Sequence, residues 1–274
     1  MQNFSIVEHH CDTFEYDYID SPEFDSEIST HTHNGWEFLL VKAGELTYTV
    51  DGSVYHIIPN TLIISRPGAI HTLYPKGSIH YQRHDLLVAE SLLRKTFLDQ
   101  IPQNLHVLDV SGNQIILSLF DKMDFYLSHL QGEELDILLQ NLINELWINI
   151  CLSTQIPSKS LVTHSNAVVI KTVNYIKAHI KEPLTVHQLC QDLFLSPSYL
   201  HHCFAEHMNV TPKQYIMLQK LQMVQQALSN NANPTEVCRQ YGFRSYSTFF
   251  RNYQKIYGCR PSDIPQNNLR KIEL

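Results

Sequence analysis

VCRQYGFRSYSTFFRNYQKIYGCRPSDI, residues 237–264, decides the fold of the C-terminal half, because its apolar pattern occurs twice in the chain. The first copy lies 48 residues earlier and contains LFLSPSYL, residues 193–200. Each copy predicts two helices that are joined by a tight turn and packed against each other through apolar side chains. The matched pairs are Leu189 with Val237, Cys190 with Cys238, Leu193 with Tyr241, Leu195 with Phe243 and, after one inserted residue, Leu200 with Phe249 and Phe204 with Tyr253.

A helix over residues 212–229 is predicted between the two copies. Eighteen residues of helix measure about 27 Å, which is close to the DNA turn of about 34 Å that separates successive major-groove faces. Small polar residues open the second helix of each copy, as a recognition helix requires. The repeat therefore favours a pair of DNA-binding units over a helical hairpin repeat without such a function. The apolar face of the spacer helix contains Leu218, Leu221, Val224 and Leu228.

The whole C-terminal half is predicted to be helical. Thr185 and Thr211 suit helix N-caps, and Pro212 and Pro234 suit a first helical turn. The segment STQIPSKS has the composition of a linker, so we expect domains of residues 1–158 and 159–274. The expected helices span residues 166–180, 186–194, 198–207, 212–229, 235–241 and 246–257.

The formal charge of −7 is divided unevenly along the chain. Residues 160–274 contain 12 Lys and Arg against 6 Asp and Glu, whereas residues 1–159 contain 8 against 21. A basic module suits phosphate binding, and a solvated charge imbalance without a function is the alternative. Because no long apolar stretch occurs and the N-terminus is acidic, we expect a cytoplasmic protein without a membrane partner. The six cysteines form no CxxC pair and are expected to be free thiols.

The segments IKTVNYIKAHI, LTVHQLCQDLFLSPSYLHHCF, TPKQYI and residues 237–264 resemble the DNA-binding domain of the AraC/XylS family of transcription regulators. The resemblance covers residues 168–264. It implies a regulator that binds double-stranded DNA through two helix-turn-helix units and is not an enzyme, with RNA polymerase as a further candidate partner. The most specific matches are Gly242, Phe243, Phe249, Arg251, Lys255, Gly258 and Pro261.

The same resemblance assigns side chains to DNA contact. Arg251 is the candidate for a bidentate guanine contact, with a phosphate contact or a surface salt bridge as the alternative. The first unit departs from the family pattern, since histidines and Ala205 stand where cations are usual and Lys220 precedes Leu221 where arginine is usual. Its contribution to phosphate binding is expected to be weak. The DNA-facing residues are Ser198, His201 and His202 in the first unit, and Arg244, Tyr246, Ser247, Thr248, Arg251 and Lys255 in the second, with Arg260 as a further phosphate contact.

The N-terminal half alternates short β-rich runs with turn signals over residues 36–88. Asp51-Gly52, Pro59-Asn60 and Pro67-Gly68 mark turns, and strands at this spacing predict a sandwich or barrel. After Glu90 the pattern becomes helical. A helix over residues 133–152 carries an apolar stripe that we expect to pack on the barrel or on a second subunit, which predicts a homodimer. The stripe contains Leu135, Leu138, Leu139, Leu142, Leu146 and Ile150.

Residues 28–88 resemble the two motifs of cupins. His31, His33, Glu37 and Gly44 have the spacing of the first motif, and RPG, residues 66–68, followed by His71 has that of the second. The second motif is imperfect, since it has Asn60 and Arg66 where glycine and proline are common and no asparagine four residues beyond His71. The expected fold is therefore α+β and multidomain: an N-terminal cupin-like barrel with a helical dimerisation segment, and an all-α domain of two helix-turn-helix units.

Two interpretations of the histidines stay open. Cupins that bind metal use three histidines and one carboxylate, so the same residues would serve a metal-dependent cupin enzyme fused to a DNA-binding domain. We adopt the other interpretation, an effector pocket that needs neither metal nor cofactor. Its residues are His31, His33, Trp36, Glu37 and His71, with Tyr48, His56 and Tyr81 as further aromatic surface, and a sugar is one candidate effector.

Overall fold

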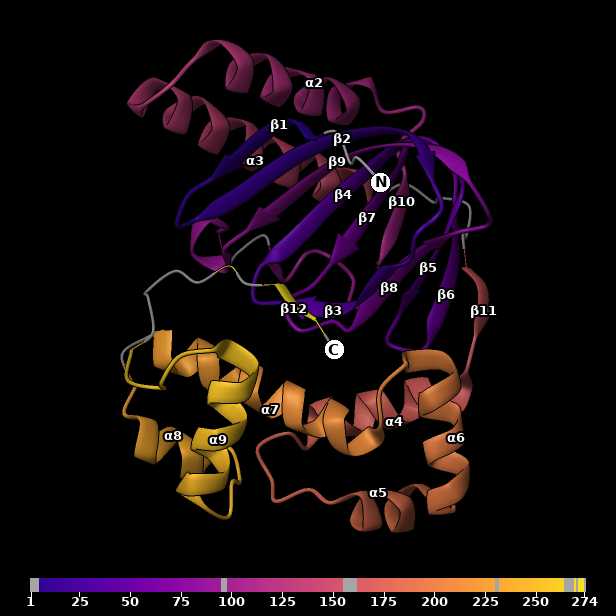
Figure 1. The fold of residues 1–274 in the computed structure, drawn as a ribbon, viewed down its shortest axis with the longest axis vertical. Helices are drawn as coiled ribbons and strands as arrows, with labels where there is room; N and C mark the ends of the chain where they lie inside the picture. The colour runs from indigo at the N-terminus through magenta and orange to yellow at the C-terminus, as the bar shows by residue number, and fades with distance from the viewer. Residues whose placement is uncertain are drawn as a thin grey trace.

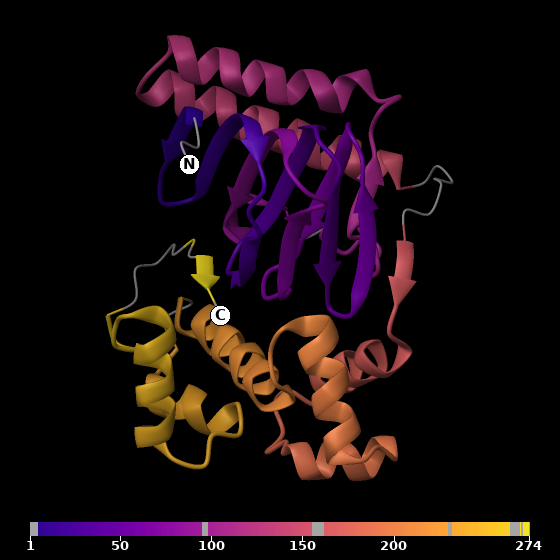
Figure 2. The same cartoon turned by 45° about the vertical axis from the view of Figure 1, so that its right-hand side comes forward.

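The computed structural model describes residues 5–94, 98–154, 162–229, 232–263, 269 and 271–273. Two β-sheets of the N-terminal half form a sandwich domain, and a helical domain built from the C-terminal half lies beneath it (Figure 1, Figure 2). A pair of helices, α2 (Gln114–His129) and α3 (Glu133–Ser153), covers the sandwich on the side away from the helical domain. Within the described chain, no helix combines the length and apolarity needed to cross a membrane.

Each described sheet has six strands, and all the paired strands are antiparallel. The first sheet has the order β1 (Ser5–His10), β2 (Phe14–Phe24), β9 (Ile79–Val88), β4 (Trp36–Ala43), β7 (Thr61–Ser65) and β10 (Val107–Asp109). The second has the order β11 (Val162–Ser165), β6 (Ser53–Ile57), β5 (Leu46–Val50), β8 (His71–Pro75), β3 (Ile28–His33) and β12 (Lys271–Glu273). The runs predicted over residues 36–88 are confirmed as strands.

Strand β4 explains how the sandwich and its helical cover share one core. Successive side chains of a strand point to opposite faces. Leu39 and Val41 pack in the interior between the sheets. Trp36 and Phe38 belong to the other core cluster, which includes residues of α2 and α3. Because both faces of β4 are covered, its sequence is apolar almost throughout instead of alternating with polar residues.

The apolar stripe of α3 is buried within its own domain. Leu135, Leu142 and Leu146 are 5%, 6% and 1% exposed. Of the two partners expected for this stripe, the barrel is confirmed and the second subunit is wrong, because the stripe already packs against the first sheet and α2. The apolar side chains that α3 leaves exposed are instead Ile137, Ile148 and Leu152.

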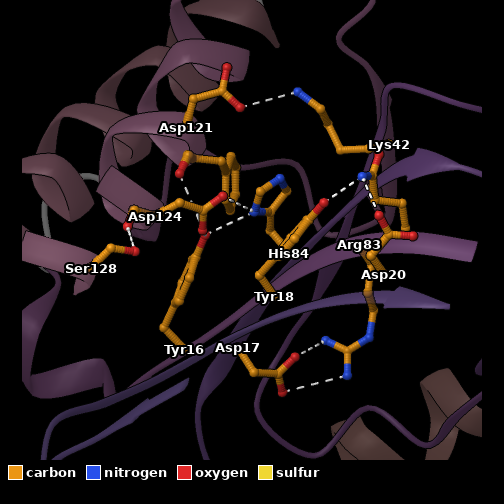
Figure 3. A network of polar contacts seen from close by, with 12 residues as sticks. Tyr16, Asp17, Tyr18, Asp20, Lys42, Arg83, His84, Asp121, Asp124 and Ser128 are labelled. Atoms are coloured by element: carbon orange, nitrogen blue, oxygen red, sulfur yellow. Dashed lines mark hydrogen bonds and ion pairs between the residues drawn. The ribbon is translucent and has the colours of Figure 1, made fainter. Parts of the chain in front are cut away.

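A polar network attaches α2 to the first sheet (Figure 3). The Tyr16 hydroxyl donates to the Asp124 carboxylate on α2, and it lies 2.8 Å from Nδ1 of His84 on β9. Burial, and then the charge of Asp124, raises the pKa of Tyr16, so the phenol keeps its proton and remains a donor. Lys42 and Asp121, 3.3 Å apart, add a second contact at the surface.

The helical domain contains α4 (Ala167–Ala178), α5 (Val186–Leu193), α6 (Pro197–Met208), α7 (Pro212–Ser229), α8 (Pro234–Gln240) and α9 (Tyr246–Tyr257). These helices confirm the six predicted from the sequence to within three residues at each end. Both predicted caps are present: Thr185 Oγ1 accepts from Gln188 N at 3.1 Å, and Thr211 Oγ1 accepts from Gln214 N at 3.2 Å.

The two copies of the repeat fold alike and lie at opposite ends of α7 (Figure 1). The turn of the first is closed by Leu195 N donating to Cys190 O at 2.9 Å, and that of the second by the matching bond from Phe243 N to Cys238 O at 3.1 Å. The residue before each donor has a positive φ, 58° at Phe194 and 68° at Gly242. Only the second copy has the residue that accepts this conformation without steric cost.

None of the described cysteines forms a disulfide, and Cys151, Cys190, Cys203 and Cys238 are buried, which confirms the expectation of thiols without disulfides. The predicted domain boundary lies outside the described residues, within residues 155–161. Beyond it, β11 pairs with β6 and β12 pairs with β3, so the C-terminal half adds two strands to the second sheet. The sequence analysis did not predict these strands, nor β1 to β3, although β2 alternates apolar Phe14, Tyr16 and Tyr18 with acidic Glu15 and Asp17. The partners of β3, β11 and β12 are distant in the chain, so their pairing leaves no local pattern.

The hairpin turn between β5 and β6 joins the two domains. Asp51 and Gly52 both have positive φ, 46° and 85°, as expected for this turn. The Asp51 carboxylate lies 2.6 Å from Lys177 Nζ on α4 and accepts from the Tyr215 hydroxyl of α7 at 3.1 Å. Gln219 of α7 donates to Gly68 O at 2.7 Å. These polar contacts set how the helical domain sits beneath the sandwich.

Candidate functional site

Strand register brings three histidines and one carboxylate together between the sheets. His31 on β3 lies opposite His71 on β8, and their ring centroids are 4.2 Å apart. Glu37, on β4 of the facing sheet, has its Oε2 atom 3.5 Å from His33 Nε2 and 3.3 Å from His71 Nε2. All four side chains are buried. The structure therefore assembles these four predicted effector residues into one cluster, the histidine cluster.

Each imidazole of the histidine cluster is held by a backbone carbonyl two residues away. The Nδ1 atoms of His31, His33 and His71 lie 2.7, 2.8 and 3.0 Å from the carbonyl oxygens of Ser29, Gly35 and Ala69. A carbonyl oxygen only accepts, so each Nδ1 carries a proton and Nε2 is the ring nitrogen left for another partner. This is the arrangement in which histidine binds a metal ion, with the other ring nitrogen donating to a carbonyl.

Glu37 is kept ionised inside the cluster. Burial favours the neutral acid, but the imidazoles of His33 and His71 hold the pKa of Glu37 well below its usual range. Ser65, its partner across β4 and β7, donates to Oε2 at 2.7 Å, and the Tyr48 hydroxyl lies 3.0 Å from Ser65 Oγ. Ligand atoms of His31, Glu37 and His71 all lie within 4.8 Å of one another, so these residues fit a metal ion.

The cluster faces a small cavity of about 150 Å³. Its other side is lined by Arg83 and Asp85 of β9 and by Asp17 of β2. Arg83 Nη1 lies 2.6 Å from Asp17 and 3.1 Å from Asp85. Burial, and then the charge of Glu37, raises the pKa of Asp85 to about 8. Most pockets for organic ligands measure about 300–1,000 Å³, so this cavity suits an ion or a very small molecule.

Trp36, the fifth predicted effector residue, is not part of the cluster. It points to the opposite face of β4 from Glu37, where its ring packs against Trp147 and under the Arg66 guanidinium, 4.7 Å from the ring centroid. It lines a different and much larger cavity of about 1560 Å³, between the sandwich and the helical domain. Of the further aromatic residues, Tyr48 supports Glu37 through Ser65, Tyr81 packs against Phe24, and His56 lies 3.5 Å from Glu45.

Sequence reasoning missed Ser65, Arg83, Asp85 and Asp17. Arg83 and Asp85 follow Tyr81 at two-residue spacing along β9, so all three side chains lie on the face between the sheets. Two charged residues at this spacing on the inward face of a strand are a signal of a polar interior. Ser65 had no such signal, because its role follows only from its pairing with Glu37 across β4 and β7.

The second recognition helix, α9, presents its predicted DNA-facing residues to solvent. Ser247, Arg251 and Lys255 are exposed and follow one another at four-residue spacing, so they share one face of the helix. Tyr246 and Thr248 are exposed in the first turn of the same helix, Arg244 is exposed just before it, and Arg260 is exposed beyond its end. The opposite face holds the unit together through Phe249 and Tyr253, which are fully buried.

The first recognition helix, α6, exposes Ser198, His201 and His202. Glu206 lies on the same face, with its carboxylate 3.6 Å from His202 Nε2, so this surface is less basic than that of α9. Lys220 does not reach the surface: it is 5% exposed, and its ammonium group donates to the carbonyls of Glu182 and Tyr241 at 2.6 and 2.9 Å. It therefore joins the two units internally.

Comparisons with known proteins agree with this architecture. Residues 18–159 match the AraC-like ligand binding domain, and residues 189–267 match a helix-turn-helix domain. The first match alone covers more than half of the chain. The chain therefore belongs to the AraC/XylS family of transcriptional regulators, with an N-terminal ligand-binding domain and a C-terminal DNA-binding domain.

Individual relatives are distant. The chain is 26% identical over 168 residues to the probable transcriptional regulator LumQ of Photobacterium leiognathi, covering 61% of this chain and 64% of LumQ. It is 26% identical over 128 residues to the raffinose operon transcriptional regulatory protein RafR of Pediococcus pentosaceus, covering 46% of each. The match thus spans less than two thirds of either relative. The AraC-like transcriptional activator CuxR is 17% identical, covers 85% of this chain and 83% of its own, and superposes with a TM-score of 0.41.

We predict that Asp85→Asn makes the free energy of unfolding less dependent on pH. In the folded protein Asp85 keeps its proton up to about pH 8, whereas in the unfolded chain it loses it near about pH 3.9. Between these values the folded state binds more protons, so Asp85 lowers the free energy of unfolding as the pH rises. Urea unfolding followed by tryptophan fluorescence from pH 5 to pH 8 measures this slope.

The matched control is Asp12→Asn, which changes an exposed aspartate. It should leave the slope as in the unmodified protein. An Asp85→Asn slope equal to that of the control would contradict a protonated Asp85.

Proposed function

We propose that this chain is a transcription regulator that binds specific DNA sites and responds to a small molecule. The observation that carries the proposal is the doubled helix-turn-helix, in which α6 and α9 bury one face in their own unit and leave the predicted DNA-facing residues exposed at opposite ends of α7. A cytoplasmic location and contact with RNA polymerase stay predictions. The metal-dependent enzyme considered from the sequence finds no support in the relatives.

The experiment for DNA binding is a gel-shift titration of the full chain against a selected site and against random DNA. Binding should weaken steeply with salt, because phosphate contacts release counterions. Arg251→Ala should weaken binding to the selected site by about 1–3 kcal/mol, the usual cost of losing a bidentate base contact, and should affect random DNA less.

The matched control is Arg94→Ala, which removes an exposed arginine of the sandwich domain and should leave both affinities unchanged. Equal losses on both DNAs would make Arg251 a phosphate contact. Failure of the unmodified protein to bind any duplex at low salt would overturn the proposed function.

A homodimer is the second part of the proposal. It is supported by the exposed apolar residues of α3, since Ile137, Ile148 and Leu152 are 53%, 42% and 55% exposed. Their spacing places them along one side of the helix, so two copies could pack these sides against each other.

We expect the full chain to sediment as a dimer at micromolar concentration. Ile148→Glu should convert it to a monomer, because a charge would then be buried at the centre of the contact. The matched control is Ile115→Glu, which changes an exposed isoleucine on α2. A monomeric unmodified protein would show that the exposed side of α3 does not dimerise.

The histidine cluster stays a predicted effector pocket, and the small volume of its cavity limits the size of the molecule or ion that it can bind. A divalent transition metal ion is a second candidate, favoured by the three imidazoles whose Nδ1 atoms are all bound to carbonyls. When bound, such an ion would supply a fixed positive charge between the sheets. His31, Glu37 and His71 would hold it, with His33 beside Glu37.

Zinc added to chelator-treated protein should raise the thermal unfolding midpoint. At a hundredfold excess over Kd the stabilisation is about 2.7 kcal/mol. Glu37→Gln should abolish the shift, whereas Glu45→Gln, the same change at an exposed position, should preserve it. An unchanged midpoint, together with metal-free protein after purification without chelator, would exclude the metal and leave the cluster to a small organic ligand.

A further inference from the structure

The large cavity between the two domains has walls from both of them. The sandwich contributes Trp36 and Arg66 near the ends of its strands, together with Tyr55 of β6 and His106 just before β10. The helical domain contributes residues of α4, among them Asn174, and of the spacer helix α7. A molecule in this cavity would therefore contact both domains at once.

The charged groups that line this cavity balance. Asp51, Glu90 and Glu182 oppose Arg66, Lys177 and Lys181, and Asp51 and Lys177 already form an ion pair. Burial lowers the pKa of His106 to about 4, so this imidazole is neutral at physiological pH. The lining offers no excess charge of either sign, which disfavours a strongly anionic or cationic ligand.

Amide side chains are unusually frequent in the same lining. Eight of its residues are Asn or Gln, and four of them, Gln219, Gln222, Gln225 and Gln226, lie along α7. An amide both donates and accepts hydrogen bonds, and so does a hydroxyl group. Because a ligand rich in hydroxyl groups can pair with several amides without carrying a charge, this lining matches polyhydroxylated molecules.

Four lining residues also keep a buried polar atom that has no hydrogen-bond partner within the described chain. These atoms are Trp36 Nε1, Arg66 Nε, His106 Nδ1 and Gln225 Nε2. The nitrogens of Trp36, Arg66 and Gln225 only donate, so the partners they lack are acceptors. All four atoms are shielded from solvent, so oxygen atoms of a ligand in the cavity would satisfy them only after these side chains turn toward it.

We propose that a neutral, hydroxyl-rich ligand of di- or trisaccharide size binds in this cavity. Its volume of about 1560 Å³ accommodates such a molecule, whereas the 150 Å³ cavity at the histidine cluster does not. The inference rests on the proposed function and moves the site of the organic effector from the histidine cluster to the domain junction. Trp36 is the only residue of the effector set expected from the sequence that lines it.

Binding there would act on DNA recognition through α7. Gln222 lies against the Gly68 turn of the sandwich, where a Cβ atom would fall 1.4 Å from its Oε1 atom, and Gln219 donates to the Gly68 carbonyl. A ligand that competes for these amides changes how α7 contacts the sandwich. Since α7 separates the two recognition helices, their placement relative to the sandwich changes with it.

The test is calorimetric titration of the full chain with a panel of neutral saccharides, namely sucrose, maltose, melibiose and maltotriose, and with the anionic disaccharide digalacturonate. At least one neutral member should bind, and digalacturonate should not. Gln222→Leu and Asn174→Leu should each weaken binding about tenfold, the loss expected for one hydrogen bond of ordinary strength. The matched control, Gln114→Leu at the exposed first residue of α2, should leave the affinity unchanged.

Several results would overturn the inference: no neutral saccharide binds, only digalacturonate binds, or the two cavity variants bind as tightly as the control. A gel shift of the same protein without saccharide separates this failure from that of the proposed function. DNA binding without any saccharide binding would refute the site alone, and loss of both would refute the proposed function as well.

Discussion

The arrangement of the two domains depends on the Asp51 carboxylate. It is 7% exposed and receives two donors from the helical domain, Lys177 and Tyr215. A buried carboxylate is tolerated only when it is paired, so separating the domains without hydrating this group is costly. The turn that carries Asp51 requires positive φ at two successive residues, and a Cβ atom at Gly52 would collide with Val169 of α4. The residues that allow this turn to form are thus the same residues that position the helical domain against the sandwich.

From this junction the structure separates two chambers with different chemistry. The chamber between the sheets is small and rich in ionisable groups, with three imidazoles and Glu37 on one side and Arg83 with its carboxylates on the other. The chamber at the junction is large, balanced in charge and rich in amides. β4 divides them, since Glu37 and Trp36 are neighbours in sequence that point to opposite faces of one strand.

The helical domain is also tied to the sandwich through the end of the chain. β12 pairs with β3, placing Glu273 opposite His31 and Lys271 opposite His33. Ile272 of the same strand belongs to the core cluster of the second helix-turn-helix unit. The strand that carries two histidines of the cluster therefore pairs with a segment that packs on the second DNA-binding unit.

The sequence by itself determined the doubled helix-turn-helix, its helix ends and the strands over residues 36–88, because helical and strand periodicity, caps and turn residues are local properties. It also identified the four residues of the histidine cluster, through motif spacing. Only the tertiary structure decided that Trp36 belongs to another cavity, that Arg83 and Asp85 face the cluster, that the stripe of α3 is internal and that Lys220 is buried. Each of these depends on which face of an element meets which distant partner, and pairing between segments far apart in the chain leaves no mark at short spacing.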